Sequence, residues 1–213
     1  MIKKPVLLFL ILLFQFSLFT QEKLFVPNEN QRAINNKTRT DNGELGKKYW
    51  QNKIKYIIKA DFNPKTGFLK GKEAINYINL SPYTLNTLVI NLYPNLYKKG
   101  STRDKPVDLG DLHEGIVISR IEIDNLEINP NGKDCFFEGT HLYLALPNSL
   151  KTNKETSLTI EWEFNIQKTT QLRTGKYDEN TWFIGYWYPQ IAVFDDVFGW
   201  DEVPYDGLHE FYS

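Results

Sequence analysis

The chain has 213 residues, which is long enough for one hydrophobic core, and its length alone does not require two domains. Hydrophobic residues make up 41% of it and charged residues 24%, which is the ordinary balance of a globular protein. The formal net charge of -1 provides no basic excess to hold a phosphate backbone, so nucleic acid is not expected as a partner.

Residues 1–20 have the pattern of an export signal. The positive pair Lys3-Lys4 precedes an apolar run from Val6 to Phe19, which is shorter than the roughly 20 apolar residues of a membrane-spanning helix. We predict a signal peptide cleaved near Thr20-Gln21, after which no stable membrane insertion is expected. Leu18 departs from the small-residue cleavage pattern, so an uncleaved anchor is the alternative. The predicted location is secreted or periplasmic.

Residues 21–48 are polar, contain several asparagines and show little apolar periodicity. This composition is typical of an extended lead-in or a flexible linker, so we predict no regular element there. We expect the folded domain to cover residues 49–213.

Beyond Tyr49 the sequence alternates between apolar and polar residues, a pattern that places one face of a β-strand in a core. The turn Asn63 to Gly67 follows the first of these predicted strands. The apolar faces that we predict are Ile54, Tyr56, Ile58, Ala60 and Phe62; Leu88, Ile90 and Leu92; Leu142, Leu144 and Leu146; and Leu158, Ile160, Trp162, Phe164 and Ile166.

Two local features refine this strand prediction. The alternation shifts phase between Ile118 and Ile121, which predicts a β-bulge near Ser119-Arg120. Pro147-Asn148 is predicted to close the strand that precedes it. Short strands separated by turn residues, without helical periodicity after the signal region, predict an all-β fold. The architecture that we expect is an antiparallel sandwich of twisted sheets.

The segment from Trp182 to Trp200 is dense in aromatic side chains. Residues at this density either build a core or line a recognition surface. We interpret them as core packing, with a stacking platform for sugars as the alternative. The aromatic residues of this segment are Trp182, Phe183, Tyr186, Trp187, Tyr188, Phe194, Phe198 and Trp200.

Four acidic residues, Asp195, Asp196, Asp201 and Glu202, lie within and just after this segment. They do not match a calcium loop, which needs Asp or Asn at alternate positions followed by glycine. A carboxylate pair for glycoside hydrolysis depends on distances that a sequence does not give. We interpret the four residues as a charged turn between strands.

The order Trp187-Tyr188-Pro189, then Ala192 to Asp196, then Gly199-Trp200, resembles the amino-terminal β-domain of secreted bacterial relatives of aminopeptidase N, a family of zinc metallopeptidases. Asn79 to Pro82 and Leu92 to Asn95 look like the early strands of that domain. The resemblance implies that the domain precedes a thermolysin-like zinc domain and forms one wall of the substrate cleft.

The resemblance also implies a substrate-binding position. Many relatives carry a glutamine just before the Trp-Tyr-Pro segment, where it helps to bind the amino group of the substrate. In this chain the position is occupied by Tyr186, a departure from the family pattern. Tyr186 is therefore our one candidate substrate-binding residue.

A zinc peptidase of this family needs His-Glu-x-x-His on a helix, where two histidines bind the metal and the glutamate activates water. His113-Glu114 and His209-Glu210 both lack the second histidine, and His141 begins a predicted strand. The family's Gly-x-Met-Glu-Asn segment is also absent, because Met1 is the only methionine. We predict no catalytic residue, no metal ligand and no cofactor in this chain.

The function implied by the resemblance is that of an amino-terminal substrate-cleft domain of a secreted zinc aminopeptidase, not catalytic on its own. Zinc is expected in the missing catalytic domain, and the peptide substrate is expected to be met through that domain. Leu208 to Tyr212 looks like an interrupted strand, so the β-domain is expected to be truncated at its C-terminal end. The alternative is an independent secreted β-sandwich module that binds carbohydrate or peptide.

Overall fold

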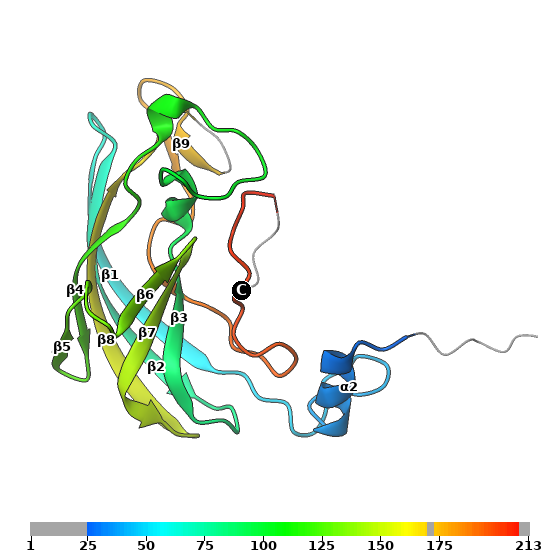
Figure 1. Cartoon of the computed structure of the whole chain (residues 1–213). Helices are drawn as coiled ribbons and strands as arrows, with labels where there is room; N and C mark the ends of the chain where they lie inside the picture. The colour runs from blue at the N-terminus through cyan, green and yellow to red at the C-terminus, as the bar shows by residue number, and fades with distance from the viewer. Residues whose placement is uncertain (1–24, 170–172, 209–213) are drawn as a thin grey trace, which may run out of the picture.

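The computed structural model describes residues 25–169 and 173–208, and its main feature is a pair of β-sheets that pack face to face (Figure 1). The first sheet has the order β1 (Lys53–Asn63), β2 (Phe68–Asn79), β8 (Lys154–Asn165), β4 (Val117–Ile123) and β5 (Leu126–Ile128). The second has the order β11 (Gln190–Ile191), β3 (Leu85–Asn91), β7 (His141–Leu150) and β6 (Cys135–Glu138). Neighbouring strands of the described sheets are antiparallel, which confirms the predicted all-β sandwich.

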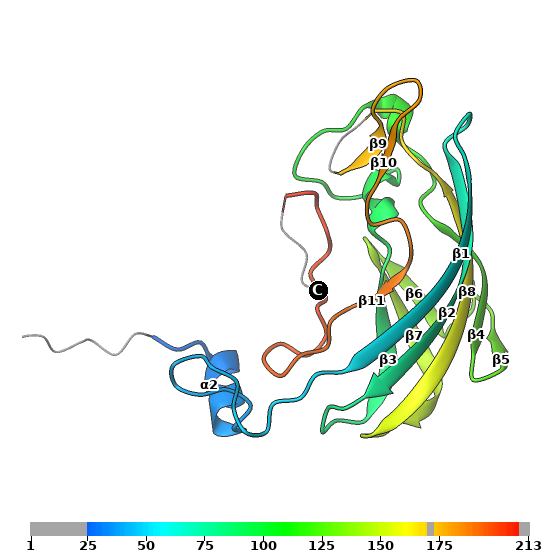
Figure 2. The same cartoon turned by 180° about the vertical axis from the view of Figure 1, so that it is seen from behind.

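Smaller elements lie outside the two sheets. A separate two-stranded pair consists of β9 (Thr174–Lys176) and β10 (Trp182–Ile184). The helical elements are α2 (Asn28–Asn35), η1 (Tyr93–Tyr97) and η2 (Leu109–Asp111). In Figure 2, α2 lies beyond the lower end of the sheets, close to the loop that follows β11.

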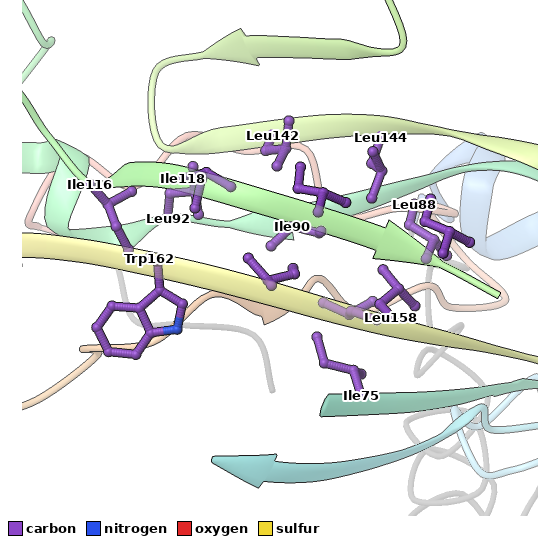
Figure 3. Close-up of a cluster of buried hydrophobic side chains, with 14 of the residues drawn as sticks. Ile75, Leu88, Ile90, Leu92, Ile116, Ile118, Leu142, Leu144, Leu158 and Trp162 are labelled. Carbon is purple, nitrogen blue, oxygen red and sulfur yellow. The ribbon is translucent and has the colours of Figure 1, made fainter. Parts of the chain in front are cut away.

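The core lies between the sheets and receives side chains from both (Figure 3). Leu88 and Leu142 reach into it from the second sheet, and Ile75 and Leu158 from the first. The strand predicted around Trp162 is β8, and its alternation is confirmed because its even-numbered apolar residues are buried while Glu163 and Asn165 are exposed. The predicted bulge is confirmed as well, since the pairing of β4 with β8 shifts between Ile118 and Arg120.

The prediction that Pro147-Asn148 closes a strand is wrong. β7 continues to Leu150, although its regular pairing with β3 stops at Ala145 and resumes only where Leu150 meets Leu85. Proline has no N–H to donate to a ladder, and it is tolerated inside β7 because it falls in this irregular stretch.

The first predicted strand is present as β1, with Tyr56, Ile58 and Phe62 packed against the core. Its inward face is less buried than we expected, since Ile54 is 38% exposed and Ala60 is also exposed. The reason is the position of β1 at the edge of its sheet, where only β2 covers one side.

The lead-in over residues 21–48 is not simply extended. It contains α2, which buries Ala33 and ends at Asn35; after the C-cap Asn36, Lys37 adopts the left-handed conformation with φ 65°. An isolated helix of 8 residues is marginal in water, so its stability comes from tertiary contacts that its local sequence pattern does not show. One such contact is the bond from Arg32 to the carbonyl of Val197.

No helix in residues 25–169 and 173–208 is long and apolar enough to span a membrane. The predicted signal peptide, residues 1–20, lies outside the described residues.

The central pair of the first sheet is β2 with β8, and it brings Trp162 directly against Gly71. A Cβ atom at Gly71 would lie 2.4 Å from the Cζ2 atom of the Trp162 ring. The indole therefore packs on the bare backbone of β2, an approach that only glycine permits.

Glu73, on the same inward face of β2, is completely buried, and among the described residues neither of its carboxyl oxygens has a hydrogen-bond partner. Burial raises the pKa of Glu73 to about 9, because a charged carboxylate would lose its hydration there. The carboxyl group is therefore protonated at neutral pH. When Glu73 does ionise, its negative charge acts to raise the pKa of Tyr56 and of Tyr188.

Replacing Trp162 with alanine should lower the free energy of unfolding by about 3–5 kcal/mol, because it leaves a cavity over Gly71. Glu161→Ala should change it by less than about 1 kcal/mol, since Glu161 faces the other way and forms its ion pairs with the partly exposed Lys72 and Arg120. Urea denaturation measures both values. A larger cost for Glu161→Ala would contradict the strand phase described above.

Glu73→Gln should remove a pH dependence of stability that the unsubstituted chain shows. The folded-state pKa of about 9 lies above the ordinary value of 4.5, so the stability from Glu73 is present below pH 4.5 and is lost as pH rises toward 9. Across that interval the free energy of unfolding should fall by about 1.4 kcal/mol per pH unit. Urea melts over the interval test this, and Glu163→Gln, an exposed change on β8, should keep the slope. An equal slope in Glu73→Gln would contradict the prediction.

Candidate functional site

The C-terminal segment Trp182–Val203 is the part of the chain on which the functional prediction rests. In Figures 1 and 2 it runs from β10 through β11 along the edge of the second sheet, in orange to red. Its backbone is attached to β3, since β11 pairs with Asn91 and Ile90 and the Ala192 amide donates to the carbonyl of Val89 at 2.8 Å.

The aromatic residues of this segment pack mainly against the core. The ring centroid of Trp187 lies 5.7 Å from that of Trp162, and the centroid of Trp182 lies 5.3 Å from that of Phe62. Tyr188, Phe194 and Trp200 are likewise half-buried against the core. This confirms core packing as their main role, although Phe183 and Phe198 are exposed.

Tyr186 lies in the turn between β10 and β11 and adopts a left-handed backbone with φ 55°. Its hydroxyl oxygen accepts a hydrogen bond from Nη1 of Arg173 at 2.8 Å. Arg173 is left-handed too, with φ 64°, and its carbonyl accepts from the Gly185 amide at 3.1 Å. Bulky residues avoid this conformation, which costs roughly 1–2 kcal/mol each, so two strained residues support one another here.

The ring of Tyr186 belongs to a cluster of three tyrosines. Its centroid lies 5.6 Å from that of Tyr93 and 6.3 Å from that of Tyr205, and those two are 5.5 Å apart. Burial raises the pKa of Tyr205 to about 12 and raises the pKa of Tyr93 as well, so both hydroxyls are neutral near pH 7. The space beside the cluster is about 10 Å³, which is at the lower limit for one water molecule.

Sequence reasoning selected Tyr186 but missed the residues around it. Arg173, Tyr93 and Tyr205 come from three separate stretches of chain, and no local pattern connects them to Tyr186. The guanidinium of Arg173 occupies the position beside the Tyr186 hydroxyl, and a cation there disfavours a substrate ammonium group. The role of Tyr186 in substrate binding stays a prediction.

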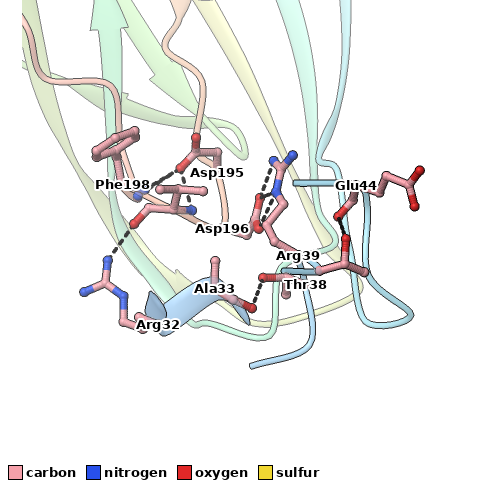
Figure 4. A network of polar contacts seen from close by, with 11 residues as sticks. Arg32, Ala33, Thr38, Arg39, Glu44, Asp195, Asp196 and Phe198 are labelled. Atoms are coloured by element: carbon pink, nitrogen blue, oxygen red, sulfur yellow. Dashed lines mark hydrogen bonds and ion pairs between the residues drawn. The ribbon is translucent and has the colours of Figure 1, made fainter. Parts of the chain in front are cut away.

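Of the four acidic residues in the predicted charged turn, Asp195 and Asp196 lie in a turn between Phe194 and Trp200 (Figure 4), whereas Asp201 and Glu202 follow that turn. The Asp195 carboxylate accepts hydrogen bonds from the backbone amides of Val197, Phe198 and Gly199 at 2.6 to 3.2 Å. The strand-like bridge from Phe194 to Trp200 closes the turn. Asp195 therefore organises the loop.

Asp196 is buried in the same turn and is bound by Arg39 of the lead-in. Nε and Nη2 of Arg39 donate to the two carboxylate oxygens at 2.9 and 2.8 Å. Burial acts to raise the pKa of Asp196, but the hydrogen bonds and charge of Arg39, with a hydrogen bond from Thr38, hold that pKa below its ordinary value. This ion pair fixes the lead-in to the C-terminal segment.

The histidines do not assemble a metal site in the described residues. His113 Nδ1 accepts from the Gly115 amide at 2.9 Å, and burial lowers the pKa of both His113 and His141, so both rings are neutral. Within residues 25–169 and 173–208, no group of three or more His, Cys, Asp or Glu side chains is arranged to hold a metal ion. His209-Glu210 lies outside these residues.

No protein-family model matches the chain, and no curated protein matches it. Among solved structures, it is similar to the M1 zinc metallopeptidase of Deinococcus radiodurans, with 11% identity and a TM-score of 0.38 over 55% of this chain and 21% of that one. A mutant of that enzyme bound to a Tyr-Ser-Ala substrate gives 11% identity and a TM-score of 0.38 over 57% and 22% of the two chains. The chain thus spans about a fifth of the length of these structures.

Replacing Arg39 with alanine should lower the free energy of unfolding by about 3 kcal/mol, because it leaves the Asp196 carboxylate buried without its counter-ion. Lys70→Ala is the matched control: its exposed pair with Asp61 at 3.8 Å should contribute less than about 1 kcal/mol. Urea denaturation near neutral pH compares the two. Equal small losses would mean that Arg39 does not compensate Asp196.

Proposed function

We propose that this chain is the amino-terminal domain of a secreted zinc metallopeptidase of the aminopeptidase N type. In this role it forms one wall of the substrate cleft and carries out no catalysis alone. The zinc, the catalytic water and the peptide substrate are held by a catalytic domain that is separate from these sheets.

The observation that carries the proposal is the strained pair of Tyr186, in the turn before β11, and Arg173, which directly precedes β9 and donates to the Tyr186 hydroxyl. Backbone strain in bulky residues persists where the surrounding structure enforces it, and such positions cluster at functional sites. The strain falls at the position that the family resemblance assigns to substrate binding. The neighbouring residues Pro189 and Ile191 are buried, and their packing holds the turn in place.

The chemistry of the pair refines the proposed role. A guanidinium and a phenol hydroxyl offer hydrogen bonds to a peptide carbonyl or carboxylate more readily than to an ammonium group. We therefore assign Tyr186 and Arg173 to contact with the peptide backbone, and we assign recognition of the free amine to the catalytic domain.

The alternative, an independent module for carbohydrate, has weaker support. Sugar platforms need exposed aromatic faces, whereas Trp182, Trp187 and Trp200 are packed against the core.

The purified chain should release no nitroaniline from leucyl-p-nitroanilide, even with added zinc, because no zinc-binding helix is predicted in it. Metal analysis after dialysis should find no stoichiometric zinc, with a complete aminopeptidase N as the positive control. One tightly held zinc per chain would contradict the proposal.

The DNA that follows the coding sequence gives an independent test. The proposal expects a zinc domain with His-Glu-x-x-His encoded in the same or an adjacent frame. A neighbourhood without any such domain favours the binding-module alternative.

A further inference from the structure

A groove of about 680 Å³ lies between the lead-in and the loop that follows β11. One wall consists of residues of α2 and the adjoining turns, including Ile34 and Asp41, and the other includes Phe198, Trp200 and Val203. Its volume is in the range of clefts that accept a ligand or a few anchoring side chains. It is separate from the tyrosine cluster around Tyr186.

The two walls are fixed to one another. Arg39 binds the buried Asp196, and Nη2 of Arg32 donates to the carbonyl of Val197 at 2.6 Å (Figure 4). Because both contacts cross from the lead-in to the loop, the groove is held open in the folded chain. Binding to a preformed groove does not carry the entropic cost of ordering the groove's own residues.

The groove presents apolar side chains to solvent. Phe25 is 87% exposed, and Phe198 and Val203 are each 69% exposed. Trp200, half-buried, extends the apolar surface toward the core. Apolar side chains gathered in a groove, rather than scattered singly, mark a binding surface.

The charged side chains at the groove are predominantly acidic. Asp41, Asp201 and Glu202 line it and form no ion pair within the described residues. Among the described residues that line the groove, Arg39 is the one basic residue, and its charge is balanced by Asp196. The groove therefore combines an apolar surface with negative charge. Such a surface favours a ligand that has apolar groups and positive charge.

We propose that this groove binds a basic, apolar peptide segment of a partner protein. Leucine-like side chains would cover Phe25, Phe198 and Val203, and lysine or arginine side chains would meet the carboxylates of Asp41 and Glu202. A second copy of the chain is disfavoured as the occupant, because a symmetric contact would place these carboxylates against each other.

Fluorescence anisotropy with the purified chain tests the proposal. The probe is a fluorescein-labelled peptide of about ten alternating leucine and lysine residues, and its counterpart has glutamate in place of lysine. We expect the basic peptide to bind and the acidic one not to bind. Asp41→Lys with Glu202→Lys should weaken binding about tenfold or more, and so should Phe198→Ser.

Matched variants separate the groove from the rest of the surface. Glu127→Lys with Glu163→Lys reverses exposed carboxylates on the first sheet, and Phe136→Ser removes a phenylalanine that is 60% exposed on β6. These variants should bind as the unsubstituted chain does. Equal binding of both peptides, or equal effects of groove and control variants, would overturn the proposal. Self-association abolished by Phe198→Ser would overturn it too, because the occupant would then be a second copy.

Discussion

The packing of the Trp162 ring on the bare backbone of Gly71 is the contact on which the rest of the fold depends. It lies between β8, the central strand of the larger sheet, and its neighbour β2, whose pairing with β8 runs from Phe68 to Asn79 without interruption. The ring of Trp187 also packs against this indole, with ring centroids 5.7 Å apart, so the same side chain supports the segment that carries Tyr186. The packing of the sheet and the position of the candidate site therefore both depend on the Trp162 side chain.

The sequence pattern was informative where one face of a strand is uniformly apolar. β8 and the bulge in β4 followed from a period of two, because a one-residue shift would have exposed every buried side chain. The same pattern did not predict β2, because its inward face carries Gly71 and Glu73 among its apolar residues. A glycine chosen for close approach and a carboxyl group buried as the neutral acid both weaken the apolar signal that identifies a strand.

The site was accessible from sequence only through the family resemblance, and only in part. That resemblance selected the position of Tyr186, but its partner Arg173 and the rings of Tyr93 and Tyr205 meet it through the tertiary fold. The lead-in illustrates the same limit. α2 has too few apolar residues for a helical pattern, and it depends on contacts with residues near Asp196 that are remote in the sequence.

The bond between Arg39 and Asp196 joins residues 157 positions apart, which has a consequence for the order of folding. Closing a loop of that length is costly in entropy before the intervening strands have assembled, so the contact forms late. During synthesis the lead-in leaves the ribosome long before its partner and has no native place to dock. The lead-in is thus among the last parts of the chain to reach its native contacts, and until then it is accessible to proteases.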